Sequence, residues 1–367
     1  MPNSLDNQIS QPALFSPITL GSVTFANRLW ISPMCQYQAV DGVVGEWHRA
    51  HIGALATGGA GAIVMEATGV VPEGRISIAC PGLWSQEQAD ALKPIVAFAH
   101  SQGVKMGIQL AHAGRKGSTM QPWADHKIAT KDEGGWEPVS ASPLTFHGLT
   151  QPRELTFNEI EKLIRAFGEA AARAVSVGFD FVELHAAHGY LMHQFLSPLS
   201  NVRTDSYGGD FAGRTRLIRE VVGEIRSQLP SGYPMTVRIS ATDWAENGWD
   251  IEQSIALAKE LKTLGVNLID VSSGGTVHDA KIPIGPAYQT PFAERIKNEV
   301  GIAVSTVGYI ETPQLAESIV AEGRADVVMI ARAALRNPRF PLMAASELDA
   351  NVSWPKSIAL GKPRPTK

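Results

Sequence analysis

An alternation of helical stretches with short apolar runs constrains the fold of this chain more than any other feature of its 367-residue sequence. The runs are rich in β-branched residues, and most of them follow a glycine, which ends a helix in the left-handed conformation without a steric clash. Such near-continuous apolar runs are typical of strands buried on both faces of a parallel sheet. Eight of them occur, at residues 28–34, 62–65, 104–110, 179–184, 234–239, 266–271, 302–305 and 326–330.

The stretches between these runs carry helix start signals. Thr156 and Glu159 have the spacing of a capping box, and Thr312 precedes a proline that suits the first turn of a helix. Eight strands that alternate with helices predict an α/β protein built as one closed (β/α)₈ barrel, the TIM barrel. We expect a single domain over residues 1–367.

A doubly wound open sheet is the main alternative for this pattern. Its usual mark is a phosphate-binding Gly-x-Gly-x-x-Gly loop after the first strand. Here the first strand ends in Ser32-Pro33-Met34-Cys35, which contains no glycine. The sequence therefore favours the closed barrel.

One connection is much longer than the others. From about 111 to 155, after the third strand, the chain is polar, aromatic and rich in glycine and proline. A loop of this length in a compact domain is usually functional or forms a small subdomain. We expect it to cap the ends of the strands. A C-terminal tail of about 346–367 follows the last expected helix.

The composition excludes several classes of protein. A net charge of -4 argues against binding to nucleic acid or to acidic membranes. Two cysteines, Cys35 and Cys80, are too few for a disulfide framework and fit a reducing compartment. The polar N-terminus, with Asp6, does not have the apolar core of a signal peptide, and no apolar run is long enough to cross a bilayer. We expect a cytoplasmic protein.

The fourth strand ends in two imidazoles and a phenol, His185, His188 and Tyr190. Active sites of these barrels lie at the C-terminal ends of the strands. Imidazole N–H groups hold a carbonyl oxygen as it becomes negative, and a phenol with a reference pKa of about 10 can donate a proton. The alternative is a purely structural role, in which the three residues end the strand and meet one another's hydrogen-bonding needs.

Other polar groups follow the remaining strands. Arg332, after the eighth strand, indicates a phosphorylated ligand, because these barrels bind phosphate on the last two loops. It is equally compatible with an ordinary surface arginine. The residues expected at the same face are Cys35, Tyr37, Gln109, Arg238, Gly308, Ala331 and Arg332.

Metal binding and thiol chemistry are both weakly supported. His185 and His188 would need a third ligand for a catalytic zinc, and neither His112, Glu183 nor His193 has a known zinc spacing. We expect no metal. A nucleophilic role of Cys35 lacks a recognisable histidine and acid beside it.

Several segments, in order along nearly the whole chain, resemble the Old Yellow Enzyme family of FMN-dependent ene-reductases. The resemblance is greatest to the branch of bacterial xenobiotic reductases and thermostable-type members. The main matching segments are Ser32-Pro33-Met34-Cys35-Gln36-Tyr37, Glu66-Ala67-Thr68-Gly69-Val70, Gln109-Leu110-Ala111-His112-Ala113-Gly114-Arg115-Lys116 and His185-Ala186-Ala187-His188-Gly189-Tyr190.

The resemblance implies an FMN at the C-terminal face of the barrel. By the family pattern Gln109 and Arg238 meet the pyrimidine edge of the flavin, and Gly308, Ala331 and Arg332 hold the phosphate. The remaining residues expected to bind FMN are Ser32, Pro33, Met34, Cys35 and Ala67. Cys35 also tunes the flavin in this branch.

The resemblance also implies a ping-pong reaction in which NADPH (or NADH) reduces FMN and the flavin then reduces an enone or another activated alkene. His185 and His188 hold the carbonyl oxygen, Tyr190 donates the proton, and Tyr37 forms a wall of the substrate site. A homo-oligomer, dimer or tetramer, is expected.

Two segments depart from the family pattern, the one before the phosphate-binding arginine and the C-terminal tail. Ala331 stands where a glycine often precedes the phosphate-binding arginine, which leaves the backbone N–H in place. In the tail, Ile358 and Leu360 replace a tyrosine and an arginine that often reaches a neighbouring subunit. Lys362 and Arg364 are the nearest possible substitutes for that arginine.

A second function is considered, a non-redox barrel aldolase or isomerase of a phosphorylated substrate. It shares the Arg332 phosphate site, but needs a lysine or a carboxylate base at a strand end. Lys105 lies at the start of its strand, and Asp270 is the only acid of that kind.

Overall fold

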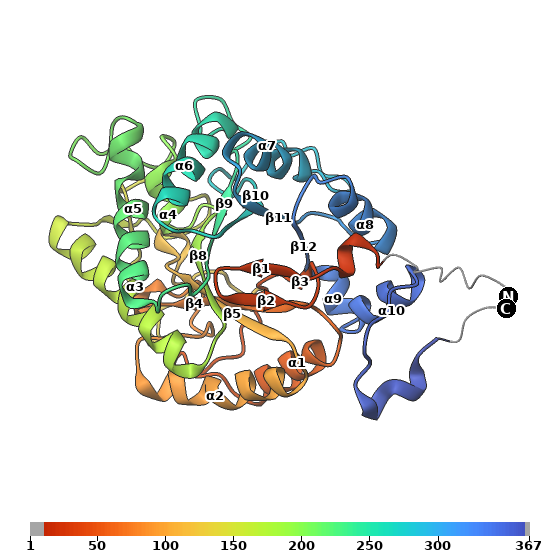
Figure 1. Ribbon diagram of the computed structural model, residues 1–367. Helices are drawn as coiled ribbons and strands as arrows, with labels where there is room; N and C mark the ends of the chain where they lie inside the picture. The colour runs from red at the N-terminus through yellow and green to blue at the C-terminus, as the bar shows by residue number, and fades with distance from the viewer. Residues whose placement is uncertain (1–10, 364–367) are drawn as a thin grey trace, which may run out of the picture.

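The computed structural model describes residues 11–363 and contains a closed barrel of eight parallel strands with helices around it (Figure 1). The strands follow one another around the barrel in chain order, so the predicted fold class is confirmed. Their bounds are β3 (Leu29–Ile31), β4 (Ala62–Gly69), β5 (Lys105–Ala111), β8 (Phe181–Ala186), β9 (Met235–Ser240), β10 (Leu268–Ser272), β11 (Ala303–Thr306) and β12 (Val327–Ile330).

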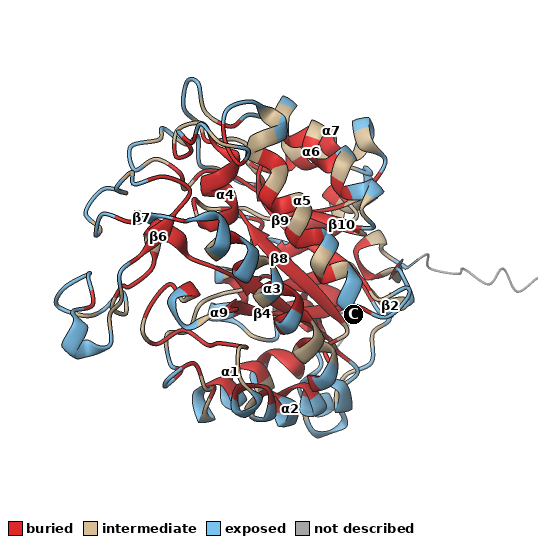
Figure 2. Cartoon of the chain, turned by 90° about the vertical axis from the view of Figure 1, so that its left-hand side faces the viewer, coloured by how far each residue is buried: buried red, intermediate tan, exposed pale blue. Residues whose placement is uncertain are grey.

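Helices pack outside the strands, and Figure 2 shows their inner faces and the strands buried while the outer faces are exposed. Thr156 caps the longest helix, as predicted, by accepting a hydrogen bond from the backbone N–H of Glu159. Gly178 ends that helix with a φ of +101°. The bounds are α1 (Glu46–Ala56), α2 (Gln86–Ser101), α3 (Phe157–Val177), α4 (Leu191–Leu196), α5 (Phe211–Gln228), α6 (Ile251–Thr263), α7 (Thr290–Val300), α8 (Pro313–Ala321), α9 (Arg332–Arg336) and α10 (Phe340–Glu347). Among the helices of residues 11–363, none combines the length and the apolar character that a membrane span requires.

A hairpin that the sequence analysis missed lies across one end of the barrel (Figure 1). Its strands are β1 (Ile18–Leu20) and β2 (Val23–Phe25). Phe25 packs against Trp30 and Phe181 inside the barrel, near the N-terminal ends of the strands. The ring centroids of Trp30 and Phe181 lie 4.3 and 5.6 Å from that of Phe25. This apolar plug closes the N-terminal end, so the opposite end is the one left for a site.

The interior is tightly filled at that level. Gly107 on β5 faces Phe181, and a Cβ at this position would lie 2.3 Å from the ring. Glycine is therefore the residue that lets a phenylalanine occupy the barrel interior.

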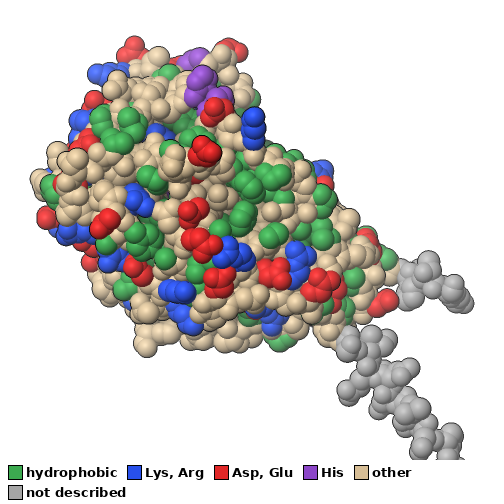
Figure 3. All heavy atoms as spheres, turned by 90° about the horizontal axis from the view of Figure 1, so that it is seen from above, with side chains coloured by type: hydrophobic (Ala, Val, Ile, Leu, Met, Phe, Trp, Pro, Cys, Tyr) green, Lys and Arg blue, Asp and Glu red, His purple; other side chains and the backbone are tan. Residues whose placement is uncertain are grey.

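The long connection after β5 forms η3 (Gly114–Lys116), η4 (Lys131–Glu133) and a small parallel pair, β6 (Val139–Ser140) with β7 (Arg153–Glu154). The remaining short helices are η1 (Ala13–Phe15), η2 (Pro72–Gly74) and η5 (Lys356–Gly361). On the face seen in Figure 3, acidic and basic side chains are interspersed rather than gathered by sign.

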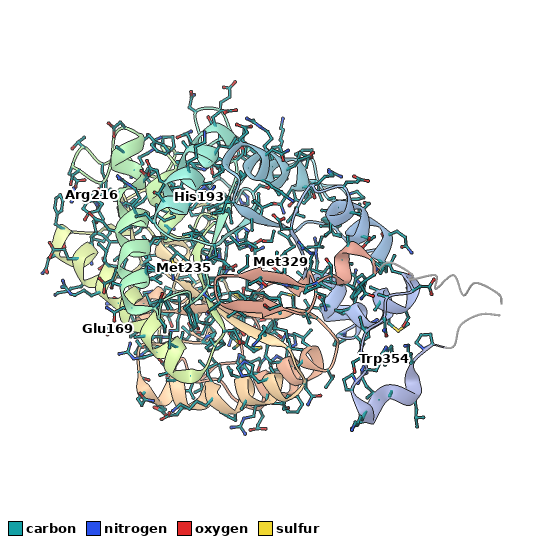
Figure 4. The ribbon with its side chains drawn as sticks, viewed as in Figure 1. Glu169, His193, Arg216, Met235, Met329 and Trp354 are labelled. Carbon is teal, nitrogen blue, oxygen red and sulfur yellow. The ribbon has the colours of Figure 1, made fainter. Side chains whose placement is uncertain are left out.

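The C-terminal tail leaves the barrel as a separate arm. Figure 4 places Trp354 on this arm, at the lower right. Leu360 is fully exposed there, so its apolar side chain packs against nothing within residues 11–363. Arg364, one of the substitutes considered for the missing arginine, lies outside the described residues.

Candidate active site

The three residues at the end of β8 come together at the C-terminal mouth of the barrel. The ring centroid of His185 lies 5.2 Å from that of His188 and 4.9 Å from that of Tyr190, both in edge-to-face contact. His188 and Gly189 have φ angles of +59° and +71°, which turn the chain sharply into α4. The predicted grouping therefore exists as one compact cluster.

Both histidines are held neutral. Burial, aided by the charge of Arg238, lowers the pKa of each imidazole well below its ordinary value. Nδ1 of His185 accepts a weak hydrogen bond from the N–H of Ala187 at 3.4 Å, and Nε2 of His188 lies 2.8 Å from Oγ of Ser272. One ring nitrogen of each histidine thus remains for a ligand.

Tyr190 keeps its proton. Burial raises the pKa of its phenol well above the ordinary value, and the nearby Cys35 and Tyr37 add to this effect. The protonated phenol and the Nε2–H of His185 are hydrogen-bond donors around one position, and the free Nδ1 of His188 lies beside them.

The turn that carries these side chains is held by side chains from other elements. The N–H of Gly189 donates to Nδ1 of His193 at 2.9 Å, and its carbonyl accepts from Nε2 of Gln194 at 2.7 Å. The carbonyl of His188 accepts from Nζ of Lys116 at 2.8 Å. The left-handed turn is therefore fixed at three backbone atoms.

His193, labelled in Figure 4, is itself fixed by a buried carboxylate. Its Nε2 lies 3.0 Å from Oδ1 of Asp243, and both side chains are fully buried. Since Nδ1 accepts from Gly189, Nε2 carries the proton and faces Asp243. Burial opposes ionisation of Asp243, but the contact with His193 and the hydrogen bond from Ser197 lower its pKa to about 2.

Gln109 and Arg238 extend into the same mouth from β5 and β9. Nη1 of Arg238 donates to Oγ of Ser32 at 3.0 Å, and its Nε lies 3.1 Å from Oδ2 of Asp270. The Gln109 side chain makes one hydrogen bond among the described residues, from Nε2 to Glu183 at 2.8 Å. Its Oε1 is left to accept from a ligand N–H.

The ends of β11 and β12 enclose a small cavity of about 50 Å³, lined by Gly308, Tyr309, Ala331 and Arg332 among others. Gly308 has a φ of +127°, and a Cβ there would lie 2.8 Å from the Tyr288 ring. The Arg332 guanidinium lies 4.1 Å from the centroid of the Tyr309 ring, and donates to its hydroxyl at 3.0 Å. The predicted phosphate residues therefore surround a cavity of their own.

A larger cleft of about 540 Å³ opens beneath the long connection. Tyr37 and Tyr190 line its floor beside Lys116, and Phe146 and Leu149 line it from the connection. Residues of the long connection thus form part of the wall of this cleft. Its other lining residues are Ile76, Thr119, Met120, Gln121, Pro122, Ala124, Asp125, His126 and Lys127.

Cys35 and Ala67 lie beside this floor in a small apolar cluster that includes Cys80. The contact with Cys80, together with burial, raises the pKa of the Cys35 thiol well above its ordinary value. Cys35 is therefore a protonated thiol rather than a nucleophilic thiolate. Pro33 and Met34 connect it to β3.

The structure gives no support to the metal and aldolase alternatives. His112 is buried, accepts from the N–H of Gly114, and has a pKa lowered to about 3 by burial. Within residues 11–363 no group of three or more His, Cys, Asp or Glu side chains is arranged to hold a metal ion. Lys105 lies at the N-terminal end of β5, away from the mouth, and forms an ion pair with Asp180 at 2.9 Å. Asp270 forms an ion pair with Arg238.

Comparison with known proteins decides between these possibilities. The family model described as the NADH:flavin oxidoreductase / NADH oxidase family matches residues 13–351. The chain belongs to this family. An NADH:flavin oxidoreductase of Gibberella zeae is 44% identical, over 94% of this chain and 88% of the relative. An NADPH dehydrogenase of a Geobacillus species is also 44% identical, over 93% of this chain and 96% of the relative.

Solved structures of this flavin oxidoreductase family support the same family membership. An Old Yellow Enzyme homologue from Zymomonas mobilis has a TM-score of 0.75 and 27% sequence identity, and the match covers 94% of each chain. The resemblance to Old Yellow Enzyme is confirmed, and the protein is an FMN-dependent oxidoreductase.

The described residues fit the FMN that this flavin oxidoreductase family uses. Gln109 offers a free carbonyl oxygen and Arg238 a guanidinium at one edge of the mouth, groups that suit the N–H and the carbonyl oxygens of a flavin pyrimidine. At another edge, the cavity of Gly308 and Arg332 supplies backbone and guanidinium donors for a phosphate.

Three buried residues of this flavin oxidoreductase, His193, Asp243 and Glu183, were not predicted as functional from the sequence. His193 was considered only as a metal ligand, and Asp243, in a loop after β9, follows no motif. Glu183 was also weighed only as a metal ligand, although it lies two residues before His185 and therefore shares its face of the strand. That alternation is the signal that places Glu183 inside the barrel.

Proposed function

We propose that this FMN-dependent oxidoreductase reduces the activated C=C bond of α,β-unsaturated carbonyl compounds with electrons from NAD(P)H. The observation that carries the proposal is the convergence of two neutral imidazoles and a protonated phenol at the floor of a cleft. The names of its relatives, which are NADPH and NADH oxidoreductases, support the choice of reductant.

FMN, when bound, supplies the two-electron chemistry, taking a hydride from the nicotinamide and passing it to the β-carbon of the alkene. Gln109, Arg238 and Ser32 would hold its pyrimidine edge. Gly308, Ala331 and Arg332 would hold its phosphate. The remaining contacts would come from Pro33, Met34, Cys35 and Ala67.

The protein side chains polarise the substrate and move the proton. His185 and His188 donate to the carbonyl oxygen and stabilise the negative charge that develops there, as an oxyanion hole does. Tyr190 gives its proton to the α-carbon. Tyr37 forms the adjoining wall of the cleft. One shared cleft for nicotinamide and alkene makes the reaction ping-pong.

Replacement of Tyr190 by phenylalanine tests this assignment. Tyr190→Phe should leave flavin reduction by NADPH unchanged but slow reoxidation by cyclohexenone about 10²- to 10⁴-fold, the usual contribution of general acid catalysis. Stopped-flow absorbance measures the two half-reactions separately. Tyr207→Phe is the matched control, because this hydroxyl donates to Glu220 away from the cleft. Equal reoxidation rates in Tyr190→Phe and the unmodified enzyme would exclude Tyr190 as the donor.

A further inference from the structure

A polar layer lies inside the barrel directly below the residues assigned to the flavin. Glu183 on β8 is fully buried and faces this interior. Strand register places it beside Gln109 on β5 and Thr236 on β9. Oε1 of Glu183 accepts from Nε2 of Gln109 at 2.8 Å, and Oε2 lies 3.1 Å from Oγ1 of Thr236.

The charges of this layer do not balance when every group is ionised. Glu183, Asp270 and Arg238 are all buried, so two carboxylates share one guanidinium. Asp270 has the better partners, since Arg238 Nε lies 3.1 Å away and Ser305 donates to it at 2.7 Å. Glu183 contacts only neutral groups, an amide and a hydroxyl.

An ionised carboxylate without a cationic partner is strongly disfavoured in a closed interior. Burial and the neighbouring charge of Asp270 raise the pKa of Glu183 to about 8, although Arg238 opposes the shift. The charged or titratable groups around it are Arg238 on β9, Asp270 on β10 and the neutral His185 on β8 itself. With an ionised Glu183, Oε1 accepts from Gln109 and Oε2 accepts from the Thr236 hydroxyl; a proton on Oε2 keeps the first hydrogen bond and reverses the second, because a hydroxyl can also accept.

We propose that Glu183 retains its proton at neutral pH and is a positioning residue, acting through Gln109, that links proton uptake inside the barrel to reduction of the flavin. With FMN bound, a hydride from the nicotinamide would supply two electrons and one proton. The negative charge that bound FMN would gain on reduction would disfavour a carboxylate at Glu183. In alkaline solution, where Glu183 is ionised before reduction, its carboxylate takes one further proton from solvent.

This inference rests on FMN binding and is independent of the enone proposed above. Its first test is infrared spectroscopy of the FMN-loaded protein as a function of pH. The expected result is a protonated-carboxyl carbonyl band near neutrality that disappears with a midpoint near the pKa of Glu183, about 8. Glu183→Gln, which mimics the protonated acid, should lack this band. Glu169→Gln should keep it, because Glu169 is an exposed partner of Arg173 on α3.

The second test is the midpoint potential of the bound flavin as a function of pH. Above about pH 8 the potential of the unmodified protein should fall more steeply than that of Glu183→Gln. The difference should approach about 30 mV per pH unit, the two-electron equivalent of one tenfold change. Equal slopes in the two proteins would overturn the inference. If Glu183→Gln does not fold, the infrared spectrum of the unmodified protein tests the inference alone. Absence of the protonated-carboxyl band at pH 6 would then overturn the inference.

Discussion

Replacement of Asp243 by asparagine tests how the catalytic turn is held. The carboxylate faces Nε2 of His193, whose Nδ1 accepts from the N–H of Gly189, next to His188 and Tyr190. An asparagine amide presents its own N–H groups to Nε2 and favours the other imidazole tautomer. Nδ1 then carries a proton and no longer accepts from Gly189.

The size of the effect follows from the pKa of Asp243, which folding lowers from 3.8 to about 2. A difference of about 1.8 units corresponds to roughly 2.5 kcal/mol of unfolding free energy, at about 1.4 kcal/mol per unit. Because the folded pKa is depressed, this stabilisation is complete above about pH 4 and is lost as the pH falls towards 2. At about 2.1 cal/mol/K of unfolding entropy per residue, a chain of this length should lose about 3 °C of melting temperature at pH 7 in Asp243→Asn.

Thermal unfolding at pH 7 and a titration of the FMN-loaded protein with a phenol, whose oxygen would meet His185 and His188, measure both consequences. The loosened turn should weaken phenol binding as well as lower the melting temperature. Asp210→Asn is the matched control, since Asp210 caps α5 and asparagine caps a helix equally well. A melting temperature and a phenol affinity equal to those of the unmodified protein would refute the tautomer argument.

Two further substitutions probe the histidine and phosphate ends of the site. Ser272→Ala removes the hydroxyl 2.8 Å from Nε2 of His188, and the released imidazole should weaken phenol binding about 5- to 10-fold, the equivalent of one hydrogen bond of about 1 kcal/mol. The phenol titration measures this, and an unchanged affinity would show that Ser272 does not orient the ring. Gly308→Val introduces a Cβ 2.8 Å from the Tyr288 ring at a φ of +127°, and should lower the affinity of the apoprotein for FMN more than tenfold. Fluorescence titration with FMN checks this against Gly223→Ala, whose Cβ meets nothing within 4 Å, and equal affinities would remove Gly308 from the phosphate site.

The barrel itself was predictable because parallel strands are buried on both faces and therefore read as apolar runs. The first strand is shorter than expected, Leu29–Ile31 rather than 28–34, since Pro33 has no N–H to continue the ladder. The β1–β2 hairpin was missed although Gly21, with a φ of +52°, and Ser22 form its two-residue turn. Its strands are only three residues each and give a weak pattern.

The site was predictable where it follows a strand end in one continuous run, as for His185, His188 and Tyr190. Gln109, Arg238 and Arg332 were expected at the same face because each lies at or just after a strand end, and their roles toward FMN came from the family resemblance. The pairing of His193 with Asp243 was not predictable, because it depends on how two separate loops pack. The same holds for the charge balance around Glu183, which requires the register of four strands.

In the proposed reaction, electrons pass from a nicotinamide through FMN to an activated alkene. An anaerobic absorbance titration of the purified protein with NADPH, followed by cyclohexenone, tests it most directly. The flavin bands should bleach with NADPH and return on addition of the enone. Bands that stay bleached after the enone would contradict the proposed substrate class, and a protein without a flavin spectrum even after addition of FMN would contradict the assignment of the site.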